Sequence, residues 1–182
     1  MLLAGNDGNL MLVNVVKAQP VREIALGAGV AAMTFTGEGR TAVLARSDGV
    51  LSIFDFLTAD PRRDVPVSAL PLTAVQTVAG AAIVGGEDAK VRRWDLATVR
   101  EEAAVDLSSA VAALAISPDL REVAVGMSNG EVVLLDAATL NQRGHLPAQH
   151  DAEAAVPICA ISWTPTALVV GDERGRVSVW SR

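Results

Sequence analysis

The sequence predicts an all-β protein built from a repeated unit of about 41 residues. Five copies align on Asp7, Asp48, Asp88, Asn129 and Arg174, at spacings of 41, 40, 41 and 45 residues. Most copies contain a short apolar run, a dipeptide of the Asp-Gly or Asn-Gly type and then an alternating apolar run. No stretch shows a convincing helical period, so an all-β fold is favoured over a mixed α/β fold.

Each complete unit is expected to contain four strands. The Asp-Gly and Asn-Gly pairs supply the positive-φ residues of a tight turn, and the flanking β-branched and aromatic residues favour a pleated, half-buried surface. The innermost strands are expected at residues 30–36, 72–79, 111–118 and 157–165, each upstream of a hairpin. The chain would then open in a second strand, over residues 1–6, and end in a third strand.

Two short motifs recur at fixed places in the repeat. Six and seven places after the anchors stand Val13-Asn14, Phe54-Asp55, Trp94-Asp95, Leu135-Asp136 and Trp180-Ser181. The segments Ser117-Pro118-Asp119 and Trp163-Thr164-Pro165 follow two of the expected innermost strands. Over essentially the whole chain, these features resemble the WD40 repeat family, in which a Trp-Asp dipeptide ends the third strand of each unit. The family's Gly-His dipeptide occurs only at Gly144-His145, so its His-Ser-Asp-Trp hydrogen-bond tetrad is incomplete in most units.

The resemblance implies a WD40-type β-propeller whose blades each have four antiparallel strands. The chain is expected to be a single propeller segment with approximate repeats at 1–14 (partial), 15–55, 56–95, 96–136 and 137–182, or about 4.5 blades. Such an incomplete, half propeller leaves open strand edges that invite pairing with another chain. A closed five-bladed monomer with two ragged blades is the alternative.

Composition restricts the classes of partner and cofactor. The 21 acidic residues outnumber the 15 basic ones, giving a net charge of −6, and direct nucleic-acid binding is not expected. One cysteine and two histidines exclude a disulfide framework and a multi-cysteine zinc site, so no cofactor or metal is expected. Cys159 is expected to be a small buried residue. Neither a signal peptide nor a membrane span is indicated, which favours a cytoplasmic or nuclear location.

Two segments have the residue types of an enzyme site but the wrong context. Residues 27–32 fit the G-x-G-x-x-G/A string of dinucleotide-binding loops, but that chemistry needs a helix after the glycines, and a strand is expected there. His145, His150, Asp151 and Glu153 cluster in a stretch where the repeat carries a four-residue insertion. They have no fixed ligand geometry, and a protruding loop is the favoured interpretation. The chain is therefore not expected to be an enzyme.

The resemblance implies a non-catalytic scaffold or adaptor that binds other proteins within a larger complex. In the family, the loops from the fourth strand to the next first strand, and from the second to the third, share one face. The candidate binding residues on that face are Gly27, Gly29, Asp48, Asp88, Asn129, His145, His150, Asp151, Glu153 and Arg174. The structural repeat positions are Phe54, Asp55, Trp94, Asp95, Leu135, Asp136 and Trp180. Alternatives are an assembly subunit whose open blades pair with a second copy or another propeller chain and, more remotely, a propeller enzyme.

Overall fold

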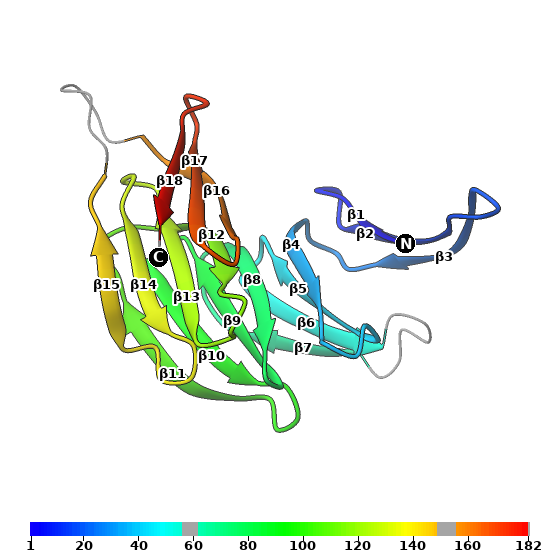
Figure 1. The fold of residues 1–182 in the computed structure, drawn as a ribbon. Coiled ribbons are helices and arrows are strands. Elements are labelled where there is room, and N and C mark those ends of the chain that lie inside the picture. The colour runs from blue at the N-terminus through cyan, green and yellow to red at the C-terminus, as the bar shows by residue number, and fades with distance from the viewer. Residues whose placement is uncertain (56–61, 149–155, 182) are drawn as a thin grey trace.

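The computed structural model describes residues 1–55, 62–148 and 156–181. Within these ranges, 18 strands form five separate antiparallel sheets and no helix is present, which confirms the all-β prediction. None of the described residues therefore lies in a helix long and apolar enough to cross a membrane. In every sheet the strands lie side by side in their order along the chain (Figure 1).

The first and last sheets have three strands among the described residues, and the middle three sheets have four each. The first sheet contains β1 (Leu2–Ala4), β2 (Asn9–Asn14) and β3 (Gln19–Ala25). The second contains β4 (Val30–Phe35), β5 (Thr41–Arg46), β6 (Val50–Asp55) and β7 (Arg63–Pro66). The third contains β8 (Leu72–Val78), β9 (Ala81–Gly86), β10 (Lys90–Asp95) and β11 (Arg100–Asp106). The fourth contains β12 (Val111–Ile116), β13 (Glu122–Met127), β14 (Val132–Asp136) and β15 (Gln142–Leu146). The fifth contains β16 (Ile158–Trp163), β17 (Ala167–Asp172) and β18 (Val177–Ser181).

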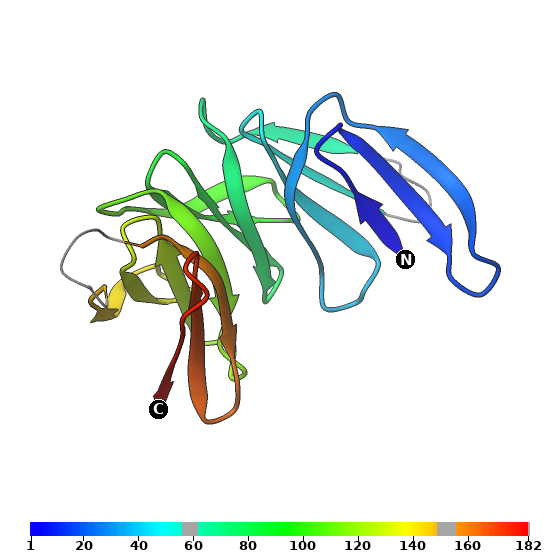
Figure 2. The same ribbon diagram turned by 90° about the horizontal axis from the view of Figure 1, so that it is seen from above.

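The expected innermost strands are found within one or two residues of their predicted bounds, as β4, β8, β12 and β16. These four strands contact one another in sequence order, and their sheets extend outward from them (Figures 1 and 2). The five sheets form an open arc, with the N- and C-termini on opposite arms.

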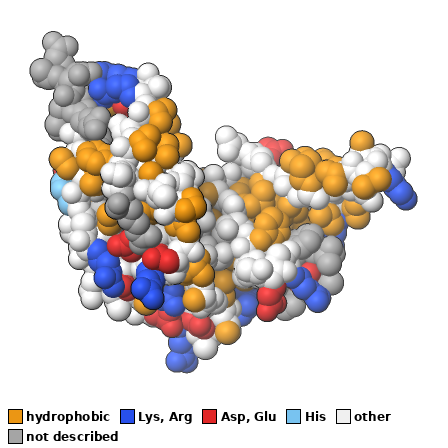
Figure 3. Space-filling view, in the orientation of Figure 1, with side chains coloured by type: hydrophobic (Ala, Val, Ile, Leu, Met, Phe, Trp, Pro, Cys, Tyr) orange, Lys and Arg blue, Asp and Glu red, His pale blue; other side chains and the backbone are white. Residues whose placement is uncertain are grey.

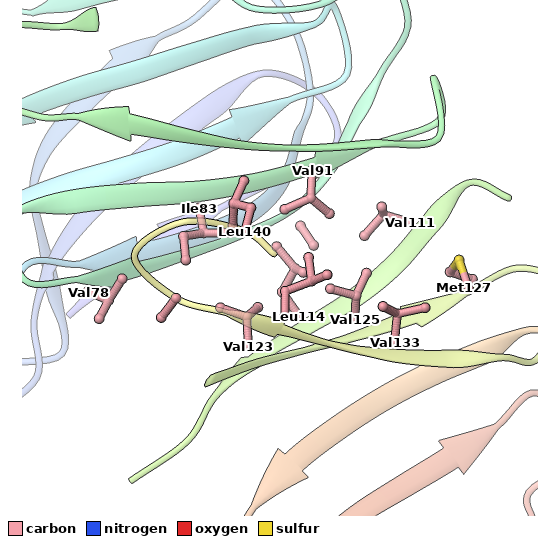
Figure 4. Packing of buried hydrophobic residues seen from close by; sticks show 13 residues of the cluster. Val78, Ile83, Val91, Val111, Leu114, Val123, Val125, Met127, Val133 and Leu140 are labelled. Atoms are coloured by element: carbon pink, nitrogen blue, oxygen red, sulfur yellow. The ribbon is translucent and has the colours of Figure 1, made fainter. Parts of the chain in front are cut away.

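Each pair of successive sheets encloses its own apolar cluster. The largest lies between the third and fourth sheets, where Ile83 and Val91 meet Val111, Val123 and Val125 (Figure 4). Three smaller clusters fill the other junctions, between the first and second, second and third, and fourth and fifth sheets. The alternation of apolar residues along each strand therefore serves two junctions, because the two faces of an inner sheet pack against different neighbours.

The aspartates of the Trp-Asp-like dipeptides cap the turn after the third strand. Asp95 Oδ1 accepts hydrogen bonds from the backbone N–H and the Oγ1 of Thr98, both at 2.6 Å. Asp136 Oδ1 accepts the same pair from Thr139, at 2.8 and 3.0 Å. The hydrogen bonds from Thr98 lower the pKa of Asp95, and a hydrogen bond from Arg143, together with those from Thr139, lowers the pKa of Asp136. Asp55 instead pairs with Arg40, across the turn between β4 and β5.

The other repeat positions contribute to packing between sheets. Phe54 and Leu135 are fully buried, and the indoles of Trp94 and Trp180 pack on the clusters of the second-to-third and fourth-to-fifth junctions.

Candidate functional site

One end of the sheets gathers two kinds of connection, which we call the linker face. It comprises the linkers between successive sheets (residues 26–29, 67–71 and 107–110) and the turns between second and third strands (residues 5–8, 47–49, 87–89, 128–130 and 173–175). Each linker donates a backbone hydrogen bond to the turn of the sheet it leaves: Leu26 N to Gly8 O at 2.8 Å, Val67 N to Gly49 O at 3.0 Å and Leu107 N to Ala89 O at 2.8 Å.

The residue just before each innermost strand accepts a hydrogen bond from the turn of its own sheet. The pairs are Ser47 N to Gly29 O (2.9 Å), Glu87 N to Pro71 O (2.9 Å), Ser128 N to Ala110 O (3.0 Å) and Glu173 N to Pro157 O (3.0 Å). Each linker is therefore fixed at both ends, and the backbone of the linker face is held by the same bonds from sheet to sheet.

The turn glycines allow the linkers to approach this closely. Gly49 has φ of +79°, and a Cβ there would lie 2.9 Å from Leu70 O. That separation is shorter than a carbon–oxygen contact permits, so a side chain would push the linker away. Ala89 occupies the equivalent position in the third sheet with φ of +57°, a left-handed conformation that costs about 1 kcal/mol for a residue with a Cβ.

The third sheet has a serine–aspartate–arginine chain on this face. Asp88 Oδ2 accepts hydrogen bonds from Ser68 Oγ in the linker (2.9 Å) and from Arg92 in β10 (2.6 Å). Burial raises the pKa of Asp88, but the hydrogen bonds from Arg92 and Ser68 outweigh burial and lower it overall. The ionised carboxylate thus ties the linker to the strand.

The fourth sheet uses different residues in the same place. Glu131 Oε2 accepts hydrogen bonds from Asn129 Nδ2 (2.7 Å) and Ser108 Oγ (2.9 Å), and these bonds lower its pKa. Its other oxygen, Oε1, lies 3.4 Å from Nε2 of His145. Ser109 and Ser128 join their hydroxyl groups at 2.7 Å beside this group.

The second sheet contains a buried guanidinium near the linker face. Arg46 is 6% exposed, and it lies 3.3 Å from Ser52 Oγ and 3.3 Å from Asp64 Oδ2 and binds Asp48 Oδ2 at 2.5 Å. Burial raises the pKa of Asp64, but hydrogen bonds from Ser52 and Arg62 and the charge of Arg46 lower it overall. All three acceptors lie on the second sheet, so this network stiffens one sheet.

Seven of the ten predicted binding residues lie in the described ranges, and six of these seven lie in the linkers and turns of the linker face. Gly27 and Gly29 lie in the first linker, and Asp48, Asp88 and Asn129 lie in successive turns. Within the string 27–32, strand β4 begins at Val30, directly after the two glycines, where a dinucleotide-binding loop would have a helix.

One predicted residue, His145, lies in a different element from the one expected. His145 was expected in a protruding loop but lies in β15, opposite Val133, because the fourth strand of that sheet extends to Leu146. Arg174 is exposed in the last turn, where Asp172, two residues earlier, makes the hydrogen bonds to Arg174 N and Arg176 N, both at 3.0 Å. His150, Asp151 and Glu153 lie outside the described residues.

Sequence reasoning missed the serines of the linkers. Ser68 donates a hydrogen bond to Asp88, in the turn of the next sheet, and Ser108 donates one to Glu131, which directly follows the equivalent turn. They are separated by 40 residues, which is the repeat spacing, so extending the alignment into the linkers would have found them.

The expectation that Cys159 is buried is wrong: its side chain is exposed. The register of β16 with β17 shifts between Ile158 and Ala160, which places Cys159 in a β-bulge. The same shift occurs in β4, β8 and β12, and none of the corresponding residues (Ala31, Thr73 and Ala112) is buried. Among the described residues, no group of three His, Cys, Asp or Glu side chains could hold a metal ion.

Comparison with known proteins gives a likeness of fold. No known protein family matches the sequence. The crystal structure of the computationally designed Ika8 protein superposes on 100% of this chain with a TM-score of 0.83 and 22% sequence identity. The chain corresponds to 55% of the Ika8 chain, so it spans about half the length of that protein. At this identity the likeness shows a shared fold alone.

Proposed function

We propose that this chain is a segment of a WD40-type β-propeller, of about 4.5 blades, and that it acts as a non-catalytic scaffold that binds another protein through the linker face. The five aligned repeats and the arc of sheets around their first strands support the blade assignment. The observation that carries the function is the linker face itself, where repeated backbone bonds hold side chains that differ from sheet to sheet.

The residue before each anchor has a side chain that varies between sheets, and in four of the five sheets it makes the same backbone hydrogen bond. These residues are Asn6, Ser47, Glu87, Ser128 and Glu173, and the last four donate their N–H groups to the start of their own sheet. Four of the five side chains are exposed, and Ser128 is half-buried. A rigid backbone that presents a changing set of polar side chains suits specific recognition of a protein surface.

The acidic groups on the linker face suit a structural role better than proton transfer. A general acid or base works best with a pKa near the working pH. Hydrogen bonds lower the pKa of Asp88, Asp64 and Glu131 instead, so these groups remain ionised acceptors at neutral pH. The net charge of −6 disfavours a nucleic-acid partner, because phosphate groups require a basic surface.

Two exposed leucines at opposite ends of the sheets provide a matched test. Leu70, 47% exposed, lies in the linker between β7 and β8, whereas Leu120, 56% exposed, lies in the turn between β12 and β13. A protein partner is isolated with the unaltered chain, and its affinity is measured by calorimetry for Leu70→Glu and Leu120→Glu. We expect Leu70→Glu to weaken binding at least tenfold and Leu120→Glu to leave it unchanged. Equal affinities, or loss only with Leu120→Glu, would refute the proposal.

A further inference from the structure

The face of the fifth sheet that points away from the fourth sheet has apolar residues typical of a buried surface, but no described sheet covers it. The residue three places after the anchor is Leu10, Leu51, Val91, Val132 or Val177. The first four are at most 3% exposed because the next sheet covers them, whereas Val177 is 68% exposed. Val179, on the same face of β18, is 66% exposed.

Gly171 shows the same difference at another repeat position. In the third and fourth sheets the equivalent residues are Gly85 and Gly126, and the first strand of the next sheet packs directly on them. A Cβ at Gly126 would lie 2.6 Å from Ile158 Cγ2, whereas the nearest atom to a Cβ at Gly171 is Ala160 Cβ at 3.8 Å. Among the described residues, only Ala160 of the same sheet has atoms within 4 Å of a Cβ at Gly171.

The first sheet has the complementary open face. We call the face that a sheet turns toward the following sheet in the chain its forward face, and the opposite face its backward face. In each junction, the forward face of one sheet therefore packs against the backward face of the next. Met1 and Leu3 lie on the backward face of the first sheet and are 57% and 45% exposed. The residues at these repeat positions in the other four sheets are at most 5% exposed.

The two open faces lie on different arms of the arc, so one copy does not join them. Figure 3 shows hydrophobic side chains gathered over the N-terminal arm and over the C-terminal arm, with a hollow between the arms. We propose that a second copy of this chain docks the backward face of its first sheet on the forward face of the fifth sheet. This head-to-tail contact joins the same two faces that meet in the four junctions within the chain, although the first sheet contributes only strands equivalent to the second, third and fourth of the other sheets.

The size of the contact sets the expected affinity. Three strands about 4.8 Å apart, with about five residues each at 3.4 Å, present roughly 250 Å² of geometric area. Stable complexes usually bury about 800 Å² per partner, so we expect a weak contact that dissociates on dilution. The relevant side chains are apolar, so association should persist at high salt concentration.

Light scattering during size-exclusion chromatography, over a dilution series, tests the contact. We expect a species of at least twice the 18.9 kDa chain mass at high concentration. Val177→Asp and Leu3→Asp should each raise the dissociation constant at least tenfold without unfolding the chain, because both side chains are already exposed. Leu120→Asp is the matched control and should leave the dissociation constant unchanged.

Mixing the variants determines the orientation of the contact. Val177→Asp retains an intact first sheet and Leu3→Asp an intact fifth sheet, so an equimolar mixture should regain association that neither variant shows alone. A monomer at every concentration would overturn the proposal. Loss of association with Val177→Asp but not with Leu3→Asp would also overturn it, because two fifth sheets would then be in contact. Partner binding through Leu70 is measured separately, so either proposal can fail alone.

Discussion

Alanine substitutions at three equivalent glycines test how closely the sheets pack. Gly85, Gly126 and Gly171 each stand three places before an anchor, in the second strand of a four-stranded sheet or its equivalent. A Cβ on Gly85 would lie 2.8 Å from Val111 Cβ, and a Cβ on Gly126 would lie 2.6 Å from Ile158 Cγ2. Both neighbours are β-branched residues with few alternative rotamers, so the strands themselves must separate.

The expected free-energy changes differ in sign. Overpacking of this kind costs about 1–3 kcal/mol, so Gly85→Ala and Gly126→Ala should lower the free energy of unfolding. At Gly171 the nearest atom is 3.8 Å away, and replacing a strand glycine there should stabilise the chain by about 0.5–1 kcal/mol. The unfolding free energies of the inner variants and of Gly171→Ala should therefore differ by about 1.5–4 kcal/mol.

Urea unfolding measured by circular dichroism provides the values, with the slope m checked for constancy. Measurements should be made at a concentration where the chain is monomeric, so that docking of a second copy does not contribute to stability. A similar change in unfolding free energy for all three variants would refute the packing described for the successive sheets.

Further predictions concern the linker face. Asp88 has a lowered pKa in the folded chain, so its stabilising contribution is fully present above its ordinary value of 3.8 and is lost as pH falls through the folded value. Asp88→Asn should therefore reduce stability at pH 7 and flatten the acid limb of a stability–pH curve; an unchanged curve would show that the Ser68–Asp88–Arg92 chain is unimportant. In hydrogen exchange followed by NMR, the N–H groups of Val67 and Leu107 should exchange as slowly as those of β9, and fast exchange would contradict a rigid linker face. Ser68→Ala should speed exchange at Val67 and leave Leu107 unchanged.

The strand positions could be predicted from the sequence because their signals are local. A turn dipeptide such as Asp48-Gly49 fixes where a hairpin reverses, and the alternation on either side shows which residues share a face. The repeat also indicates which residues of neighbouring strands pair, since five copies have the same pattern. The assignment of the linker and turn residues to one end of the sheets came instead from the resemblance to the WD40 repeat family.

The side-chain partners could not be predicted, because they depend on distances between repeats. Ser68 reaches Asp88 only after the linker folds back over the turn, and the sequence gives no measure of that distance. Cys159 was assigned to the interior because it lies in an expected innermost strand between Ile158 and Ala160, but the register shift between those two residues leaves its side chain exposed. His145 was assigned to a loop because the repeat spacing increases there, but the extra residues follow β15.

Site-specific photo-crosslinking from the linker face tests the central claim most directly. A photoreactive amino acid is placed at residue 70 in one variant and at residue 120 in the other, and adducts are identified by mass spectrometry. The proposed scaffold function predicts a protein adduct at position 70 that excess unlabelled chain prevents, and no such adduct at position 120. A competed adduct at position 120 alone, or at neither position, would contradict binding through the linker face.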